Sequence, residues 1–180
     1  IDLYLEGNTN AFNTLVLRHK NKIYTAICIL VKSHDIADDI FQQVFVKIIE
    51  KITAGQYNEE GKFINWALRI AHNMCMDHYR LKKRIPVLNY SEGYDAFENI
   101  NLSEEGIDTK IFNADIHANL KSMLDRLSEE QREVIVLKHF ADLSFKEIAE
   151  LTNCSINTAL GRMRYAITNL RKLNTEFQLV

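Results

Sequence analysis

The chain has 180 residues, 47% of them hydrophobic, a composition that permits one or two packed domains and excludes wholesale disorder. With one proline and six glycines, it has too few chain breakers for an all-β fold of many turns and favours long helices. The net charge is −2, which by itself argues against a nucleic-acid-binding protein. Three scattered cysteines without a CxxC motif argue against a disulfide framework or zinc ribbon and predict a reducing, cytoplasmic compartment.

The first half of the chain shows hydrophobic residues at helical spacing in three segments, about 10–31, 35–52 and 62–84. Ser33 and Asp35 offer caps for the second helix. The predicted inward stripe of the second helix is Ile36, Ile40, Val44, Ile48 and Ile52, and that of the third is Phe63, Trp66, Ala67, Ile70, Ala71 and Met74. The sequence therefore predicts a three-helix domain over residues 1–84, with Trp66 in its core.

The second half begins with a segment of different composition. Residues 85–112 contain the only proline, show no sustained period and carry a charge of −5, so we expect an acidic linker. Four helices are predicted beyond it, at about 113–126, 129–140, 145–151 and from about 156 to 172. Capping boxes at 128–131 and 144–147 begin the second and third, and Asn153 ends the third. The fold class predicted for the chain is all-α, with two helical domains, 1–84 and 113–180.

The last helix carries the strongest local signal for function. A short helix, a turn at 152–154 and a longer helix have helix–turn–helix spacing, and residues 155–180 carry +3. The predicted inward stripe is Ile156, Leu160, Met163, Ile167 and Leu170, and the predicted outward stripe is Thr158, Arg162, Tyr165 and Asn169, flanked by Arg164, Arg171 and Lys172. Such a helix can enter a major groove, although a solvated basic face on a core helix gives the same pattern.

The helix at 62–84 carries a second basic surface. The segment has a charge of +5, and its expected outer side bears Asn65, Arg69, His72 or Asn73, Met76, Arg80 and Lys83, with Lys82 and Arg84 near its end. This side suits contact with a phosphate backbone, and Asn73 could bond a base edge, but composition alone favours an ordinary solvated face.

Enzymatic activity has little support in the sequence. It contains no HExxH motif, glycine-rich phosphate loop or nucleophile elbow, and His72 with Cys75 does not complete a metal site. We therefore predict no catalysis, no cofactor and no metal. The acidic cluster Asp35, Asp38 and Asp39 is explained by the start of a helix.

Three segments resemble the sigma factors of bacterial RNA polymerase. DIADDIFQQVFVKI (35–48) resembles their core-polymerase-binding helix, and FINWALRIAHNMCMDHYR (63–80) resembles their promoter −10 helix, including the Asp77–Arg80 pair. The segment 127–172 resembles their −35-recognising domain. The order and coverage are those of an extracytoplasmic-function (ECF) type sigma factor, in which a linker stands between two domains.

The resemblance implies roles for particular residues and names the partners. The residues implied to bind polymerase are Asp38, Asp39, Gln42, Gln43 and Phe45. Those implied to bind the −10 element are Arg69, Asn73, Arg80, Lys83 and Arg84. Those implied to bind the −35 element are Ser155, Thr158, Arg162, Arg164 and Tyr165. The implied partners are the clamp helices of the largest polymerase subunit and the flap region, promoter DNA, and an anti-sigma factor. Tyr57, in the loop at 53–61, is placed where family members trap a flipped base. Leu160, Gly161 and Tyr165 depart from the common family pattern, so the exact −35 sequence does not carry over.

The resemblance predicts a promoter-specificity subunit that recognises −35 as duplex and −10 as melted DNA. Two alternatives remain open from the residues alone. One is a helix–turn–helix regulator that binds duplex DNA without polymerase, and the other is a helical adaptor that binds only protein.

Overall fold

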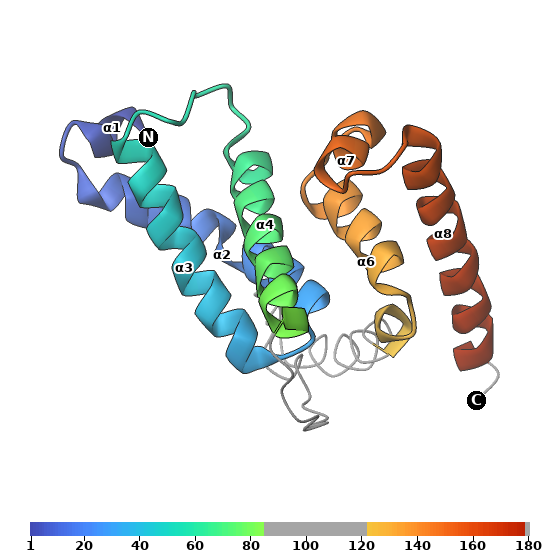
Figure 1. Cartoon of the computed structure of the whole chain (residues 1–180). Coiled ribbons are helices and arrows are strands. Elements are labelled where there is room, and N and C mark those ends of the chain that lie inside the picture. Colours follow the sequence, from blue (N-terminus) through green and yellow to red (C-terminus); the bar gives the residue numbers. More distant parts are fainter. Residues whose placement is uncertain (85–121, 179–180) are drawn as a thin grey trace. The chain divides into compact units, whose positions relative to one another are not determined.

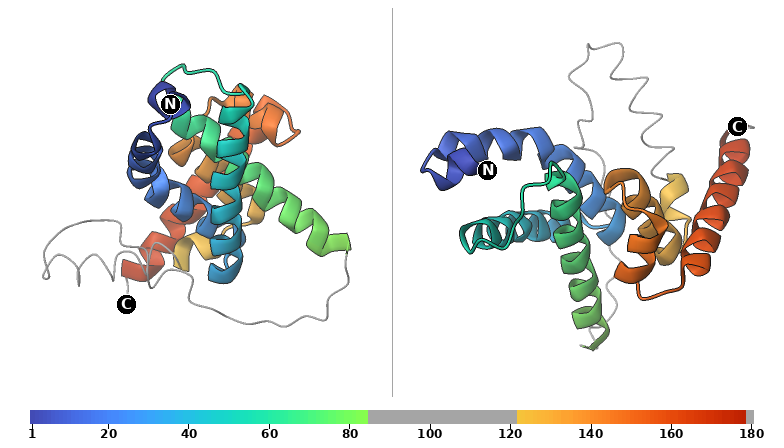
Figure 2. Two further views of the ribbon diagram at one scale, coloured as in Figure 1. Left: turned by 90° about the vertical axis from the view of Figure 1, so that its left-hand side faces the viewer. Right: turned by 90° about the horizontal axis from the view of Figure 1, so that it is seen from above.

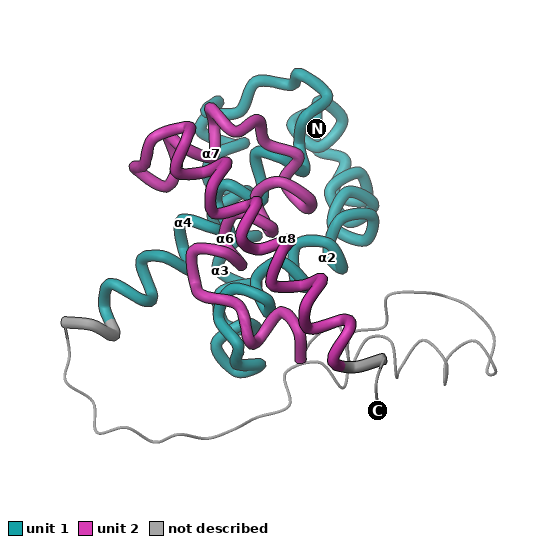
Figure 3. The backbone as a smooth tube through the Cα atoms, turned by 90° about the vertical axis from the view of Figure 1, so that its right-hand side faces the viewer, with its two compact units in different colours: residues 1–96 teal, residues 97–180 magenta. Residues whose placement is uncertain are grey.

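The structure is a computed structural model that describes residues 1–84 and 122–178 (Figure 1). Every regular element in these two ranges is a helix, as expected for an all-α chain. The chain divides into two compact units, Ile1–Ala96 and Phe97–Val180 (Figure 3). The predicted linker at 85–112 and nearly all of the helix predicted at 113–126 lie outside the described residues, so both stay predictions.

Unit 1 contains α1 (Asp2–Leu5), α2 (Thr9–Val31), α3 (His34–Thr53) and α4 (Phe63–Arg84). The three long helices pack against one another and α1 lies against α2, an arrangement visible in Figures 1 and 2. The three long helices were predicted within a few residues of their ends. The four-residue α1 was not, because one turn is too short to show a hydrophobic period.

The core of unit 1 forms where α2, α3 and α4 meet. On α3 four of the five residues of the predicted stripe, Ile40, Val44, Ile48 and Ile52, are buried, and Ile36 at its start is half-buried. The stripe spans four turns of one face, which buries a continuous apolar surface against the other two helices. The hydroxyl of Tyr79 on α4 donates a hydrogen bond of 2.7 Å to the carbonyl of Leu30, which ties α4 to the end of α2.

The ends of α2 follow ordinary capping chemistry. The side chain of Asn8 accepts a hydrogen bond from the N–H of Ala11 at 3.3 Å, and Lys32 ends the helix with a φ of 56°. Ser33 occupies the N-cap position of α3, but its side chain makes no capping hydrogen bond.

Unit 2 contains α6 (Glu129–Ile135), η1 (Val136–Phe140), α7 (Phe145–Leu151) and α8 (Ile156–Gln178). The element η1 is a π-helical turn that continues α6, so the helix predicted at 129–140 is present but changes its hydrogen-bond pattern midway. Both α6 and α7 pack against α8, which extends past the predicted end at 172.

The predicted helix–turn–helix is present. Ser144 and Glu147 form a complete capping box at the start of α7, and Asn153 ends the turn after it with a φ of 51°. At the start of α6 the box is only half formed. Ser128 accepts from the N–H of Gln131, whereas the side chain of Gln131 accepts a hydrogen bond from Asn169 on α8.

Candidate functional site

The outer face of α3 carries the residues expected to bind polymerase. Asp38, Asp39, Gln42 and Gln43 are all exposed, so four polar side chains gather on one side of a single rigid helix. Val46 lies among them at helical spacing, three and four residues beyond the glutamines, and is 56% exposed. This face therefore combines acidic and amide groups with an exposed apolar side chain, a mixture suited to a protein interface.

Phe45 does not share that exposed face. It is half-buried, with its ring at 5.0 Å from that of Phe41 and 6.5 Å from that of Phe12, both in edge-on arrangements. Phe45 thus supports α3 from within unit 1, and Val46 is the apolar residue that sequence reasoning missed. The period of α3 contained the signal, because Val46 follows Asp39 by seven residues and so lies on the same side.

A hydrogen-bond network holds the start of this face in place. The hydroxyl of Tyr24 on α2 donates to Asp38 at 2.8 Å and lies 3.0 Å from Nδ1 of His34. Burial raises the pKa of Tyr24 above its ordinary value, and the hydrogen bond to Asp38 raises it further. The phenol therefore stays protonated and fixes the orientation of Asp38.

The outer side of α4 is confirmed as exposed only in part. Asn73 and Arg80 are exposed, and Arg80 is ion-paired with Asp77 at 2.9 Å, as predicted. Arg69 is half-buried, and His72, the alternative to Asn73 on this side, is 2% exposed and belongs to the core. Lys83 and Arg84 lie in the last turn of α4, beyond the side chains that the structure describes.

An aromatic cluster borders the start of α4. Tyr57, in the loop between α3 and α4, has its ring 4.5 Å from that of Trp66 and 6.1 Å from that of Phe63. Burial, and then the charge of Glu59, raise the pKa of Tyr57 to about 12. Trp66 packs against this loop as well as against the core, and it is half-buried. The prediction of a core tryptophan is therefore right only in part.

At the start of α8 the predicted hydroxyl groups bond each other. Ser155 is the N-cap, and its Oγ accepts a hydrogen bond from the N–H of Thr158 at 3.0 Å. The hydroxyl of Thr158 lies 2.8 Å from the same Oγ. Both side chains are exposed, yet their polar atoms are engaged in starting the helix.

The polar and basic residues predicted to face outward from α8 fall into two groups, one in contact with α6 and one exposed. Arg162 is half-buried and lies 3.9 Å from Glu133 on α6, and Asn169 bonds Gln131 on the same helix. Arg164 and Tyr165 are exposed, Tyr165 by 66%. The predicted outward stripe is therefore wrong for Arg162 and Asn169, which face α6.

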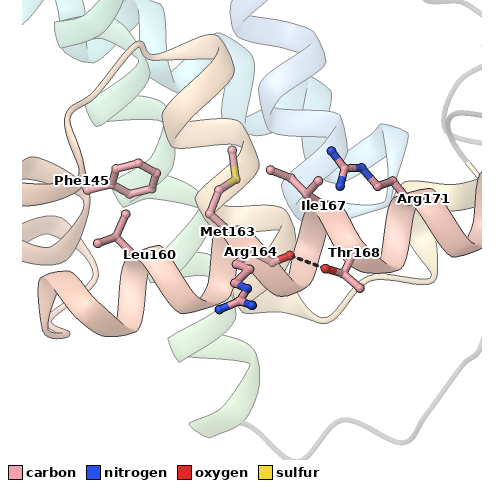
Figure 4. A pocket seen from close by; sticks show the side chains of 7 residues that line it. All are labelled: Phe145, Leu160, Met163, Arg164, Ile167, Thr168 and Arg171. Atoms are coloured by element: carbon pink, nitrogen blue, oxygen red, sulfur yellow. Dashed lines mark hydrogen bonds between the residues drawn. The ribbon is translucent and has the colours of Figure 1, made fainter.

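The predicted inward stripe of α8 also needs correction. Its buried residues are Ala159, Met163 and Ala166, whereas Ile156, Leu160 and Ile167 are 47%, 44% and 38% exposed. The small alanines lie where α8 meets its neighbours, and the larger aliphatic side chains stand beside that contact. Figure 4 shows the result, a shallow groove lined by Phe145, Leu160, Met163, Arg164, Ile167, Thr168 and Arg171.

Within 1–84 and 122–178 no group of three histidine, cysteine or acidic residues could hold a metal ion. Over the same part of the chain, no helix has the length and apolar content that would let it cross a membrane.

Two family models match the chain in the order of its two units. The model described as Sigma-70 region 2 matches residues 15–85, and the one described as Sigma-70, region 4 matches residues 117–163. The first match contains the exposed faces of α3 and α4, and the second contains α7, the turn after it and the start of α8 as far as Met163. The chain belongs to the sigma-70 family.

Relatives of similar length point to the ECF group of that family. This sigma factor is 28% identical over 171 residues to the ECF RNA polymerase sigma factor SigW of Bacillus subtilis, covering 93% of this chain and 90% of that protein. It is 29% identical over 174 residues to the ECF sigma-E factor of Escherichia coli, with coverage of 91% and 88%. It is therefore a promoter-specificity subunit of RNA polymerase, and a stand-alone regulator is not favoured.

Solved structures agree on the fold. The sigma factor RpoE of Bartonella quintana, solved with the anti-sigma factor NepR, has a TM-score of 0.63 at 20% identity and covers 93% of this chain and 98% of its own. CnrH, solved with the cytosolic domain of CnrY, has a TM-score of 0.58 at 24% identity, with coverage of 96% and 92%.

Proposed function

We propose that this sigma factor binds core RNA polymerase through the exposed face of α3 and binds promoter DNA through α4 and α8. The observation that carries the proposal is the separation of these faces. An acidic and amide surface with Val46 lies on α3, whereas basic and amide side chains lie on α4 and the exposed arginines on α8. The α3 face would dock on the clamp helices of the largest polymerase subunit, and unit 2 on the flap region.

In this proposal α4 holds the −10 element as melted DNA. Arg69, Asn73 and Arg80 line the side that would follow the strand, and the basic end of the helix adds Lys83 and Arg84. The Tyr57–Trp66 pair borders that side, where an unstacked base would find an aromatic surface. Bases captured in this way would offset the cost of opening the duplex.

The −35 element would be recognised as duplex by α8. Arg164 and Tyr165 are the exposed members of the predicted set, so we assign base and phosphate contact to them. Ser155 and Thr158 begin the helix, and Arg162 fixes it against α6. We therefore assign these three residues to positioning rather than to direct contact.

We propose that the chain has no catalytic activity of its own and acts in the cytoplasm, where polymerase and chromosome are found. Two of its structural neighbours were solved with partner proteins, one of them named an anti-sigma factor. By that likeness we propose an anti-sigma partner for this chain.

Reconstitution with core polymerase tests the proposal. Purified chain and bacterial core enzyme should form a stable complex that initiates on promoter fragments from the parent genome, whereas the chain alone should shift the same fragments weakly in a gel. Complex formation without promoter-specific initiation would contradict it, as would tight, sequence-specific binding of duplex by the chain alone.

A further inference from the structure

The first turns of α8 carry an exposed leucine on the side that would face DNA. Leu160 is the fifth residue of α8 and is 44% exposed. Single exposed apolar residues are common, so exposure alone assigns no role. What distinguishes Leu160 is its place, because Arg164 follows it by one turn on the same side of the helix, and Gly161 and Tyr165 lie on the adjoining side.

The surroundings of Leu160 leave this side open and apolar. A Cβ placed on Gly161 would meet nothing within 4 Å, so a base pair can approach the helix there. Figure 4 shows Leu160 beside the ring of Phe145, with Met163 also lining the groove. The half-buried Phe145 and buried Met163 thus give Leu160 an apolar backing on one side, while Arg164 stands next to it on the other.

The chemistry of base edges restricts what a leucine can recognise in a major groove. Among the four bases, thymine is the one that presents a methyl group there, at C5, whereas adenine, guanine and cytosine are distinguished by their hydrogen-bonding groups. An aliphatic side chain can exclude water from that methyl but satisfies none of the polar edges. In helix–turn–helix proteins the side chains near the start of the second helix are those that contact base edges.

We propose that Leu160 packs on the C5 methyl group of a thymine in the −35 element and makes this sigma factor selective for thymine at that position. The inference rests on the proposed role of α8 in binding the −35 duplex. Arg164, one turn further on, contacts the neighbouring phosphate or guanine and fixes the register of Leu160.

The test uses holoenzyme reconstituted from full-length chain and core polymerase. Promoter fragments randomised over the −35 hexamer are first selected for binding, and each thymine of the selected sequence is then replaced singly by deoxyuridine, which lacks only the methyl group. At one position we expect about a fourfold loss of affinity, the factor that corresponds to about 0.8 kcal/mol for one buried methyl group. The Leu160→Ala variant should bind the thymine and deoxyuridine fragments equally.

Ile167→Ala is the matched control, since Ile167 is a similarly exposed aliphatic residue of the same helix, two turns further on. It should keep the fourfold difference. The inference is overturned if deoxyuridine has no effect at any position, or if Leu160→Ala keeps the difference. A selection that yields no preferred −35 sequence at all would instead contradict the proposed function, so the two failures are distinguishable.

Discussion

Arg162 and Arg164 are two positions apart on α8 and have different surroundings. Arg162 is turned toward Glu133 of α6 and its side chain is 28% exposed, whereas Arg164 is exposed beside the groove. A side chain engaged with its own fold contributes to stability, and one left exposed beside an open groove is available to a ligand. Substitution of Arg164 should therefore change mainly the affinity for DNA, and substitution of Arg162 mainly the stability of unit 2.

Arg164→Ala should lower the affinity of holoenzyme for −35 duplex about tenfold and leave the midpoint of thermal unfolding unchanged, because it removes a contact made only with DNA. Arg162→Ala should instead lower the free energy of unfolding by about 1–2 kcal/mol, because it removes a half-buried ion pair and the packing of the arginine side chain between α8 and α6. Fluorescence anisotropy of a labelled promoter fragment and chemical denaturation measure the two effects. Equal effects of both variants on DNA affinity would contradict this division.

Asp39 tests the polymerase-binding face. Asp39→Lys reverses an exposed charge beside Gln42, Gln43 and Val46, so it should weaken binding to core polymerase at least tenfold without changing stability. The affinity of the variant chain for −35 duplex should stay as in the wild type. Glu6→Lys, a charge reversal at the exposed residue that follows α1, serves as the control. If both variants bound polymerase as the wild type does, the α3 face would be wrongly assigned.

At the scale of elements, periodicity predicted α3 well and α8 poorly. On α3 the buried residues are large and aliphatic, so Ile40, Val44 and Ile48 marked the inward face directly. On α8 the buried residues are Met163, which was predicted, and the small Ala159 and Ala166, which were not, and the larger Leu160 and Ile167 misdirected the prediction.

The contacts between helices could not be predicted from sequence patterns, for a related reason. A period gives the direction of a side chain relative to its own helix, but not the partner that another helix brings to it. The pairing of Arg162 with Glu133, and the contact of the half-buried Phe45 with Phe12 of α2, both depend on such partners. Local chemistry was readable, as shown by the capping box of α7 and the turn at Asn153.

The link between α2 and α3 should be measurable through Tyr24. Tyr24→Phe removes the hydroxyl that bonds Asp38, so the free energy of unfolding of unit 1 should fall by about 1 kcal/mol. Fluorescence of Trp66, the only tryptophan, reports unit 1 during urea denaturation. Tyr4→Phe is the control, because its ring packs on Phe12 and its hydroxyl bonds no residue within 1–84 or 122–178. Equal stability of the Tyr24 variant and the wild type would contradict the network.

The contact between α2 and α4 should make unit 1 sensitive to acid. The ring of His19 lies 5.4 Å from that of Phe63, and burial, then the charges of Arg18 and Lys22, lower the pKa of His19 from 6.5. The unfolded chain therefore binds a proton that the folded chain rejects. The contribution of His19 to stability is complete above pH 6.5 and decreases as the pH falls through the lowered pKa.

This acid sensitivity is measured by the pH dependence of unfolding. Between pH 7.5 and pH 5, the thermal midpoint of wild-type unit 1, followed by Trp66 fluorescence, should fall further than that of His19→Gln. Parallel pH profiles for the two proteins would show that His19 has no part in the loss.

At the scale of the whole molecule, the near-neutral total charge conceals an uneven distribution. The basic segments 62–84 and 155–180 contain the whole of α4 and α8, the two helices proposed to contact DNA, whereas residues 1–61 carry −2 and contain the α3 face. Each basic surface is small, so neither should hold promoter DNA tightly alone. Specific binding would then require polymerase to present both units to one promoter.

Mapping of transcript starts tests that central claim most directly. Core polymerase with and without the full-length chain would transcribe fragmented genomic DNA, and the 5′ ends of the products would be sequenced. We expect a set of starts that appears only with the chain and shares one upstream pair of −10 and −35 sequences. Starts identical to those of core polymerase alone, or new starts without any shared upstream sequence, would contradict the account.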